Sequence, residues 1–212
     1  MCINYETSLI SLIIGEMSGL TLILLSYLDS NAELIEYEKL LIGLFVMFYT
    51  IVQFCELKIY QTANSDIFAQ KLLILNLGFQ GLVFFILMSF IYKIHGIYIM
   101  ICGLVSFIII LEVLFEYNSL DIELTSNKCL KWNFLANNKI SFSLGVMFAT
   151  IFFWIFFEPN SDFIKYIGFI VLFTFIFSYF ILNNLVPNVN SPSIWCLSSA
   201  VAAPLFVFCS LL

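Results

Sequence analysis

Long apolar runs, separated by mostly short polar connections, occupy most of this chain and limit what it can fold into. A helix needs about 20 apolar residues to cross the hydrocarbon core of a bilayer. Seven such stretches can be drawn, over residues 8–28, 40–59, 70–92, 96–117, 139–157, 163–182 and 193–212. They leave no room for a separate soluble domain, so we expect residues 1–212 to form a single transmembrane domain.

The composition agrees with a membrane location. Of the 212 side chains, 62% are hydrophobic and 10% are charged, and the mean hydropathy is +1.06. That leaves too little polar surface to cover a soluble globule. The runs are continuous and not alternating, which favours helices over a barrel, because backbone groups in lipid must find partners within their own segment. The sequence therefore predicts an all-α, polytopic helix bundle of about seven spans, integral to the lipid bilayer.

The positions of the lysines favour one orientation. We call the side that holds residue 1 side A and the opposite side B. Because successive spans alternate in direction, the connections near 60–69, 118–138 and 183–192 also belong to side A. Five of the eight lysines fall on or near side A, namely Lys58, Lys71, Lys128, Lys131 and Lys139. Cytoplasmic connections carry an excess of lysine and arginine, so we predict a cytosolic N-terminus.

Several function classes are excluded by what the chain lacks. The formal net charge is −6 and arginine is absent, which argues against a nucleic-acid partner, because phosphate contacts need clustered cations. His95 is the only histidine, and it lies in the short connection between the third and fourth spans on side B. A histidine-built metal centre therefore fails, and no Ser–His or Cys–His pair can form in the polar half next to side A. The last span has no lysine for a retinal Schiff base. An enzyme would have to rely on glutamates alone, so we favour a non-enzyme and expect no cofactor, metal or catalytic residue.

Glutamates and amides inside the predicted spans are the main candidates for function. An ionisable group at the bilayer centre costs about 2.5–3.5 kcal/mol on insertion scales, so it normally faces protein or water and has a partner. The directions of the spans place all of these groups in the half of the membrane next to side A. They are Glu16, Gln53, Glu56, Asn76, Gln80 and Glu112.

We predict that these groups share one polar cluster or cavity that opens toward side A. Gln53 and Glu56 are three residues apart and so lie on one helical face; we expect Asn76, Gln80 and Glu112 to satisfy them. A carboxyl in such surroundings is a candidate proton carrier or cation ligand. Two interpretations stay open. In the first, the cluster is a site that binds or moves a proton, a cation or a small polar ligand. In the second, the chain is a structural or assembly protein of a viral or internal membrane, and its polar groups only join helices.

Three further local features carry expectations. Gly15 and Gly19 flank Glu16 with the spacing that lets helices approach closely, which favours a tight contact within the bundle and leaves a homo-oligomer as the second interpretation. The acidic stretch 29–39 is typical of a solvated helix start, with negative charges at the positive end of the helix dipole, and we favour this over the alternative of a cation site. In the longer connection 118–138 we favour a plain interfacial loop, with Trp132 as a candidate headgroup anchor, over the alternative of a lid that covers a cavity.

Three short motifs resemble a known group of proteins. The start of the chain, MCINYETSL, carries Cys2, Glu6 and Ser8; Gln53-x-x-Glu56 follows in the second span, and Ser193-x-Trp195-Cys196 opens the last. This combination resembles an uncharacterised family of small, about seven-span membrane proteins from bacteria, protists and large DNA viruses, although Asn4 replaces the serine expected there. The resemblance implies topology and no activity. It adds Trp195 and Cys196 to the candidate site on side A.

Overall fold

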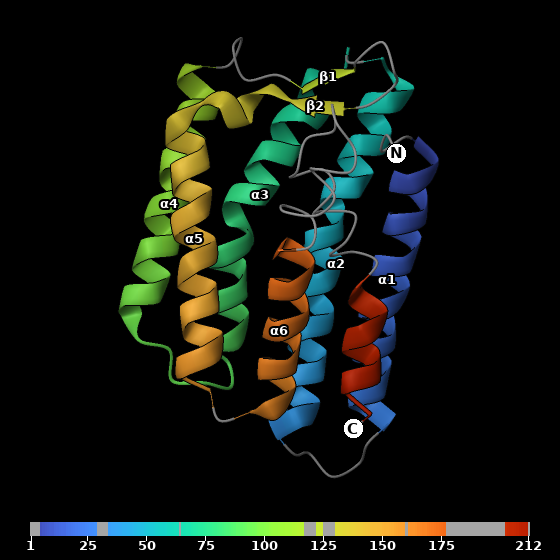
Figure 1. The fold of residues 1–212 in the computed structure, drawn as a ribbon, viewed down its shortest axis with the longest axis vertical. Helices are drawn as coiled ribbons and strands as arrows, with labels where there is room; N and C mark the ends of the chain where they lie inside the picture. The colour runs from blue at the N-terminus through green and yellow to red at the C-terminus, as the bar shows by residue number, and fades with distance from the viewer. Residues whose placement is uncertain are drawn as a thin grey trace.

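The fold is a bundle of helices that run side by side (Figure 1). The computed structural model describes residues 5–28, 34–63, 65–116, 122–124, 130–159, 161–176 and 202–211. The helices are α1 (Tyr5–Leu28), α2 (Leu34–Gln61), α3 (Ile67–Met88), α4 (Gly96–Phe115), α5 (Asn138–Phe157), α6 (Asp162–Ile176) and the helical segment 202–209. The all-α prediction is confirmed.

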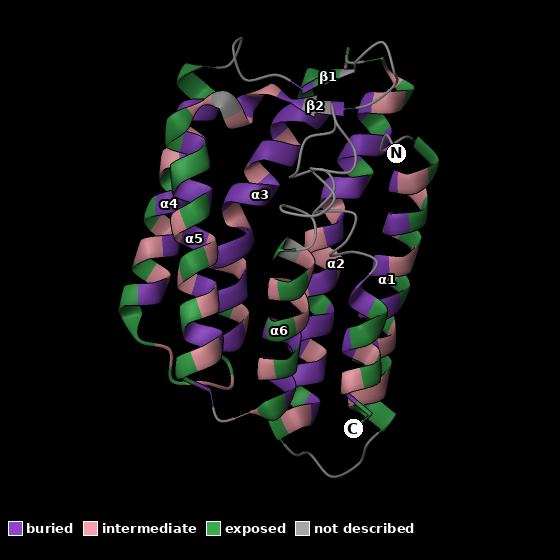
Figure 2. Cartoon of the chain, viewed as in Figure 1, coloured by how far each residue is buried: buried purple, intermediate pink, exposed green. Residues whose placement is uncertain are grey.

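Five of these helices, α1 to α5, are long and apolar enough to cross a bilayer. These helices indicate a multi-pass membrane protein. The prediction of about seven spans is not confirmed. Helix α6 has 15 residues and segment 202–209 is shorter still. The predicted spans 163–182 and 193–212 lie partly outside the described residues. Figure 2 shows exposed positions along the outer faces of α4 and α5, and large apolar side chains such as Phe107 and Phe153 occupy them, as expected for surfaces that meet lipid.

Helices α1 and α2 pack closely because both present small residues to the contact. The buried face of α1 consists of Ser8, Ser11, Gly15, Ser18, Gly19 and Leu22. A Cβ atom on Gly43 of α2 would lie 2.7 Å from the Gly19 carbonyl oxygen, so the two backbones nearly touch. The tight contact predicted from Gly15 and Gly19 is therefore confirmed within the bundle.

A two-stranded hairpin covers the end of the bundle that holds Tyr5, which we call the A end. Strand β1 (Ile122–Leu124) pairs antiparallel with β2 (Leu130–Trp132), and the short helix η1 (Asn133–Ala136) follows. Trp132 is 3% exposed and stacks on Phe134, so its predicted role as a headgroup anchor is wrong. The Gln70 side chain of α3 accepts a hydrogen bond from the Ile122 backbone at 3.2 Å, and such contacts fold the connection over the bundle.

At the opposite end, the B end, three charged residues near the start of α2 are buried, so the prediction of a solvated helix start is wrong for Glu36, Glu38 and Lys39. Helix α2 begins at Leu34, ahead of the predicted span, and distant connections supply partners for its charges. Glu38 accepts hydrogen bonds from the hydroxyls of Tyr92, after α3, and Ser161, before α6. Lys39 and Glu36 form an ion pair at 2.9 Å.

Candidate functional site

Glu56 is the most deeply buried carboxyl at the A end among the described residues. It lies five residues before the end of α2, or about 7.5 Å along the helix, and it is 1% exposed. Its Oε2 atom accepts a hydrogen bond from the Ser8 hydroxyl of α1 at 2.9 Å. Its Oε1 atom is buried with no hydrogen-bond partner among the described residues. Glu56 is therefore only half satisfied.

Gln53 adds a second acceptor on the same face of α2. It is buried one turn before Glu56, and its Oε1 atom also has no hydrogen-bond partner in the part of the chain that the structure describes. Side chains three residues apart are neighbours on a helix surface. Two buried oxygens that can accept hydrogen bonds or ligate a cation thus come from adjacent positions of α2.

A second carboxyl contact lies deeper along the same pair of helices. The Thr50 hydroxyl of α2 donates to Glu16 of α1 and also reaches the Met47 carbonyl oxygen at 2.9 Å. Thr50 lies six residues before Glu56, which is about 9 Å along the helix. Each helix therefore contributes one glutamate and one hydroxyl, in the reciprocal pairs Ser8 to Glu56 and Thr50 to Glu16. We call these four residues the α1–α2 seam.

Asn76 and Gln80 form a separate group between α2 and α3. The Asn76 side-chain amide donates to the Phe48 carbonyl oxygen at 3.1 Å, and the Gln80 amide donates to Asn76 Oδ1 at 3.3 Å. No hydrogen bond joins them to Gln53 or Glu56 among the described residues. The register explains this, because Asn76 meets α2 at Phe48, about two turns from Glu56.

Glu112 belongs to a third group, at the contact of α4 with the start of α5. Its carboxylate accepts from Lys139 Nζ at 2.8 Å and from the Asn137 side-chain amide at 3.0 Å. Lys139 has a side chain that is 68% exposed, so this ion pair faces outward. The predicted support of Glu56 by Glu112 is not what the structure describes, because α4 packs between α3 and α5 and has no extensive contact with α2.

One cavity among the described residues lies elsewhere than the predicted one. It has a volume of about 80 Å³ and lies between α2, α3, α5, α6 and segment 202–209. Its lining includes the amide of Gln80 but no glutamate. Glu56 and Glu16 face the α1–α2 seam and do not line this cavity, so the glutamate-lined cavity stays a prediction. Trp195 and Cys196, the other predicted site residues, lie outside the described residues.

Sequence reasoning missed the two hydroxyls that hold the glutamates. Ser8 shares a face with the small residues of α1 at spacings of three and four, and that pattern could have marked it as a contact residue. Thr50 likewise follows Gly43 and Val46 on the buried face of α2, but no spacing within α2 identifies its partner on α1. Among the described residues, no three His, Cys, Asp or Glu side chains lie close enough to hold a metal ion.

No protein-family model matches the chain, and no curated protein or solved structure matches it either. The resemblance to the family with the Met-Cys start therefore stays a prediction. The observations support a multi-helix protein with five candidate membrane spans, in which buried glutamates of α1 and α2 have polar partners.

Proposed function

We propose that this membrane protein binds a proton or a small monovalent cation at Glu56, and that ions reach this site from the A end. The single observation that carries the proposal is the half-satisfied carboxyl: Glu56 is almost completely buried, and one of its oxygens has no hydrogen-bond partner within the described residues. Neither of the ion pairs described involves Glu56. The missing partner is the proton or cation.

Simple energetics supports this assignment. A hydrogen bond to a charged group contributes about 1.5–3 kcal/mol, whereas a buried acceptor without a partner costs about 1–3 kcal/mol. The hydroxyl of Ser8 alone therefore does not compensate an ionised carboxylate within a membrane span. A bound proton removes the charge, and a bound cation neutralises it.

The chemistry of the neighbouring group favours a positive ligand. Gln53 presents a carbonyl oxygen without a hydrogen-bond partner in the described structure, so two buried acceptors without partners, Gln53 Oε1 and Glu56 Oε1, lie on this face of α2. Hard cations prefer oxygen ligands, and divalent ions commonly require several carboxylates. A single carboxyl beside an amide oxygen therefore suits a proton or a monovalent cation.

The test is ion-dependent stability of the purified protein in lipid nanodiscs. We would measure the unfolding temperature with Na⁺, K⁺ or Li⁺ at constant ionic strength and across a pH series, because a ligand that binds the native state raises that temperature. The Glu56→Gln variant keeps the shape of the side chain and an acceptor for Ser8. The Glu6→Gln variant is the control, since Glu6 is an exposed acid at the same end.

We expect ions or pH to change the unfolding temperature of the wild type and of Glu6→Gln equally. We expect Glu56→Gln to lose the part of this change that comes from binding at residue 56. A Glu56→Gln protein that responds as the wild type does would refute the proposal. The same variants in liposomes loaded with a pH indicator distinguish movement of the ion from binding alone.

The second interpretation is a purely structural one, and the α1–α2 seam favours it. Each seam hydroxyl joins the two helices, as polar groups in membrane helices often do. A structural role predicts that Ser8→Ala lowers stability while neither the wild type nor Glu56→Gln shows a specific response to ions. The stability series above separates the two interpretations.

A further inference from the structure

Glu16 is a carboxyl at the middle of a helix that is long enough to cross the bilayer. Helix α1 is one of the five candidate spans, and Glu16 lies eleven residues after its start at Tyr5 and twelve before its end at Leu28. It is therefore about 16–18 Å from either end of the helix. The hydrocarbon core of a bilayer is about 30 Å thick, so Glu16 lies near the centre of the membrane.

One oxygen of this carboxyl is open to the outside of the bundle. Glu16 is partly exposed, and its neighbours on the outer face of α1 are the exposed apolar residues Ile13, Met17 and Leu20. Thr50 contacts the Oε1 atom of Glu16. The Oε2 atom has no hydrogen-bond partner among the described residues and retains accessible surface. Oε2 is thus accessible beside side chains that meet lipid.

Thr50 alone does not compensate a negative charge on Glu16. A hydroxyl has one hydrogen, and Thr50 lies within hydrogen-bonding distance of both Glu16 Oε1 and the Met47 carbonyl oxygen. The carbonyl only accepts, so an ionised Glu16 competes with it for this hydrogen. Neither of the ion pairs described involves Glu16. The charged residues of α2 that are nearest to Thr50 in sequence are Glu56 and Lys58, about 9 and 12 Å farther along the helix.

We propose that Glu16 is a second proton-binding site, in the form of a neutral carboxylic acid that is open to the bilayer interior. The proton removes a charge that is costly at this depth. It also allows Glu16 to donate to Thr50 Oγ1 while Thr50 donates to the Met47 carbonyl oxygen. A metal cation does not suit this place, because it needs several oxygen ligands and the outer neighbours of Glu16 are apolar. The site is independent of the ion site proposed at Glu56.

A carboxylic acid in the hydrocarbon region has a characteristic reactivity toward lipid-soluble carbodiimides. The acid oxygen bonds to the central carbon of the reagent, and the acid proton passes to one of its nitrogens, which gives an O-acylisourea. The acyl group then moves from this oxygen to a nitrogen, and the stable N-acylurea contains every atom of both reactants. An ionised carboxylate brings no proton for the addition. In water, hydrolysis removes the O-acylisourea before it can rearrange.

The experiment treats the full chain in nanodiscs at neutral pH with dicyclohexylcarbodiimide. A second sample receives a water-soluble carbodiimide with glycine ethyl ester, which marks carboxyls that water reaches. Mass spectrometry of peptides locates the modified residues. Glu16→Gln removes the acid at nearly the same size. Glu6→Gln is the matched control, because Glu6 is the other acid of α1 and is exposed at the A end. Thermal unfolding confirms that each variant is folded.

We expect dicyclohexylcarbodiimide to modify Glu16 in the wild type, in Glu6→Gln and in Glu56→Gln, and this product to be lost in Glu16→Gln. The water-soluble reagent should modify Glu6 and leave Glu16 unmodified. If dicyclohexylcarbodiimide leaves Glu16 unmodified, or if the water-soluble reagent modifies it, the proposal is wrong.

The outcome does not depend on the ion site at Glu56. Should Glu16→Gln not fold, the residue mapped in the wild type and the contrast between the two reagents decide. If Glu56→Gln keeps the response of the wild type to ions while Glu16 is still modified, the proposed function at Glu56 fails and the proton site at Glu16 stands.

Discussion

At the scale of single residues, the reciprocal pairs of the α1–α2 seam give Glu56 and Glu16 different surroundings. Both accept a hydrogen bond from a hydroxyl of the opposite helix. Glu56 is almost fully buried, whereas Glu16 is only partly buried. The close approach of the two helices makes these pairs possible, because a serine or threonine side chain is short. The glycines of the contact are therefore part of the site.

Gly43→Ala should destabilise the protein by about 1–3 kcal/mol, the usual cost of overpacking. A Cβ at this position would lie 2.7 Å from the Gly19 carbonyl oxygen and 2.8 Å from Ile23, so α1 has to move away. Gly103→Ala is the matched control, since a Cβ there meets nothing within 4 Å. Unfolding of both variants in the same detergent measures the difference, and equal stabilities would show that the helices do not approach this closely.

The sequence predicted individual residues well where a pattern along one helix identifies them. Gln53 and Glu56 are buried polar residues as expected from their position in an apolar run, and the glycines marked the close contact. The sequence did not predict their partners, because Ser8, Thr50 and Phe48 are brought near by the packing of helices and no spacing within one helix reveals that. For the same reason Glu112 was expected beside Glu56, whereas it pairs with Lys139.

At the scale of elements, the start of α2 shows why helix boundaries were harder to predict than helices. The predicted span begins at Leu40, because the charges of Glu36, Glu38 and Lys39 look like an exposed end. Helix α2 includes these three residues, and the hydroxyls of Tyr92 and Ser161 satisfy Glu38. Local polarity cannot anticipate partners that are more than 50 residues away.

Tyr92 provides a pH-dependent test of this B-end contact. Burial, and then the hydrogen bond to Glu38, raises the pKa of Tyr92 above its ordinary value of about 10. The native state therefore retains this proton at a pH where the unfolded chain has lost it. The resulting stabilisation is complete below about pH 10 and is lost as the pH rises through the native pKa.

We expect the free energy of unfolding of the wild type to fall more steeply above about pH 10 than that of Tyr92→Phe, which has no proton to lose there. Chemical unfolding at a series of alkaline pH values measures both slopes. Tyr27→Phe is the control, because Tyr27 is 74% exposed. Identical slopes for the wild type and Tyr92→Phe would rule out this contact.

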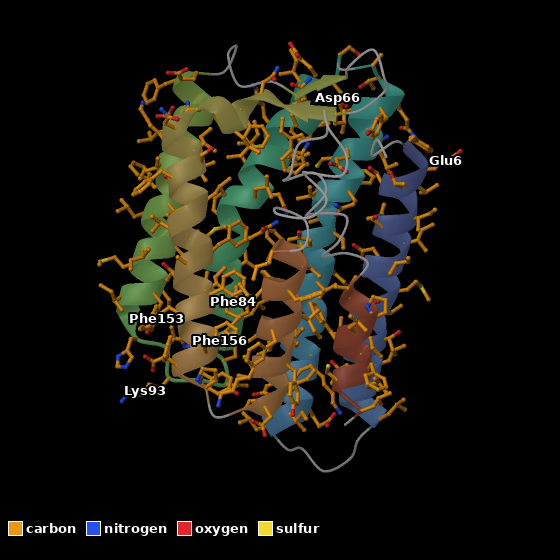
Figure 3. All side chains as sticks on the ribbon, in the orientation of Figure 1. Glu6, Asp66, Phe84, Lys93, Phe153 and Phe156 are labelled. Carbon is orange, nitrogen blue, oxygen red and sulfur yellow. The ribbon has the colours of Figure 1, made fainter. Side chains whose placement is uncertain are left out.

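At the scale of the whole molecule, the arrangement of the helices places polar groups at two separate ends. Glu6 and Asp66 lie at the A end and Lys93 at the B end (Figure 3). The five candidate spans run between these ends. Hydropathy alone predicted that successive helices run in opposite directions between the two ends, because a long apolar run in a bilayer normally forms a helix that spans it.

Cysteine labelling in sealed vesicles tests the alternation of the spans. Glu6→Cys and Ser65→Cys should react with a membrane-impermeant maleimide from the same side, and Lys93→Cys from the opposite side. The labelling of the wild type is subtracted as background for the native cysteines. If all three positions react from one side, the spans do not cross the membrane as α1 to α4 require.

The most direct test of the central claim is difference infrared spectroscopy of the protein in lipid, because it observes the Glu56 carboxyl itself. We expect the wild type to show the C=O band of a protonated carboxylic acid that disappears when the pH or the cation concentration is raised, and we expect Glu56→Gln to lack this band. A band that is unchanged in Glu56→Gln, or that no proton or cation affects, would contradict an ion site at Glu56.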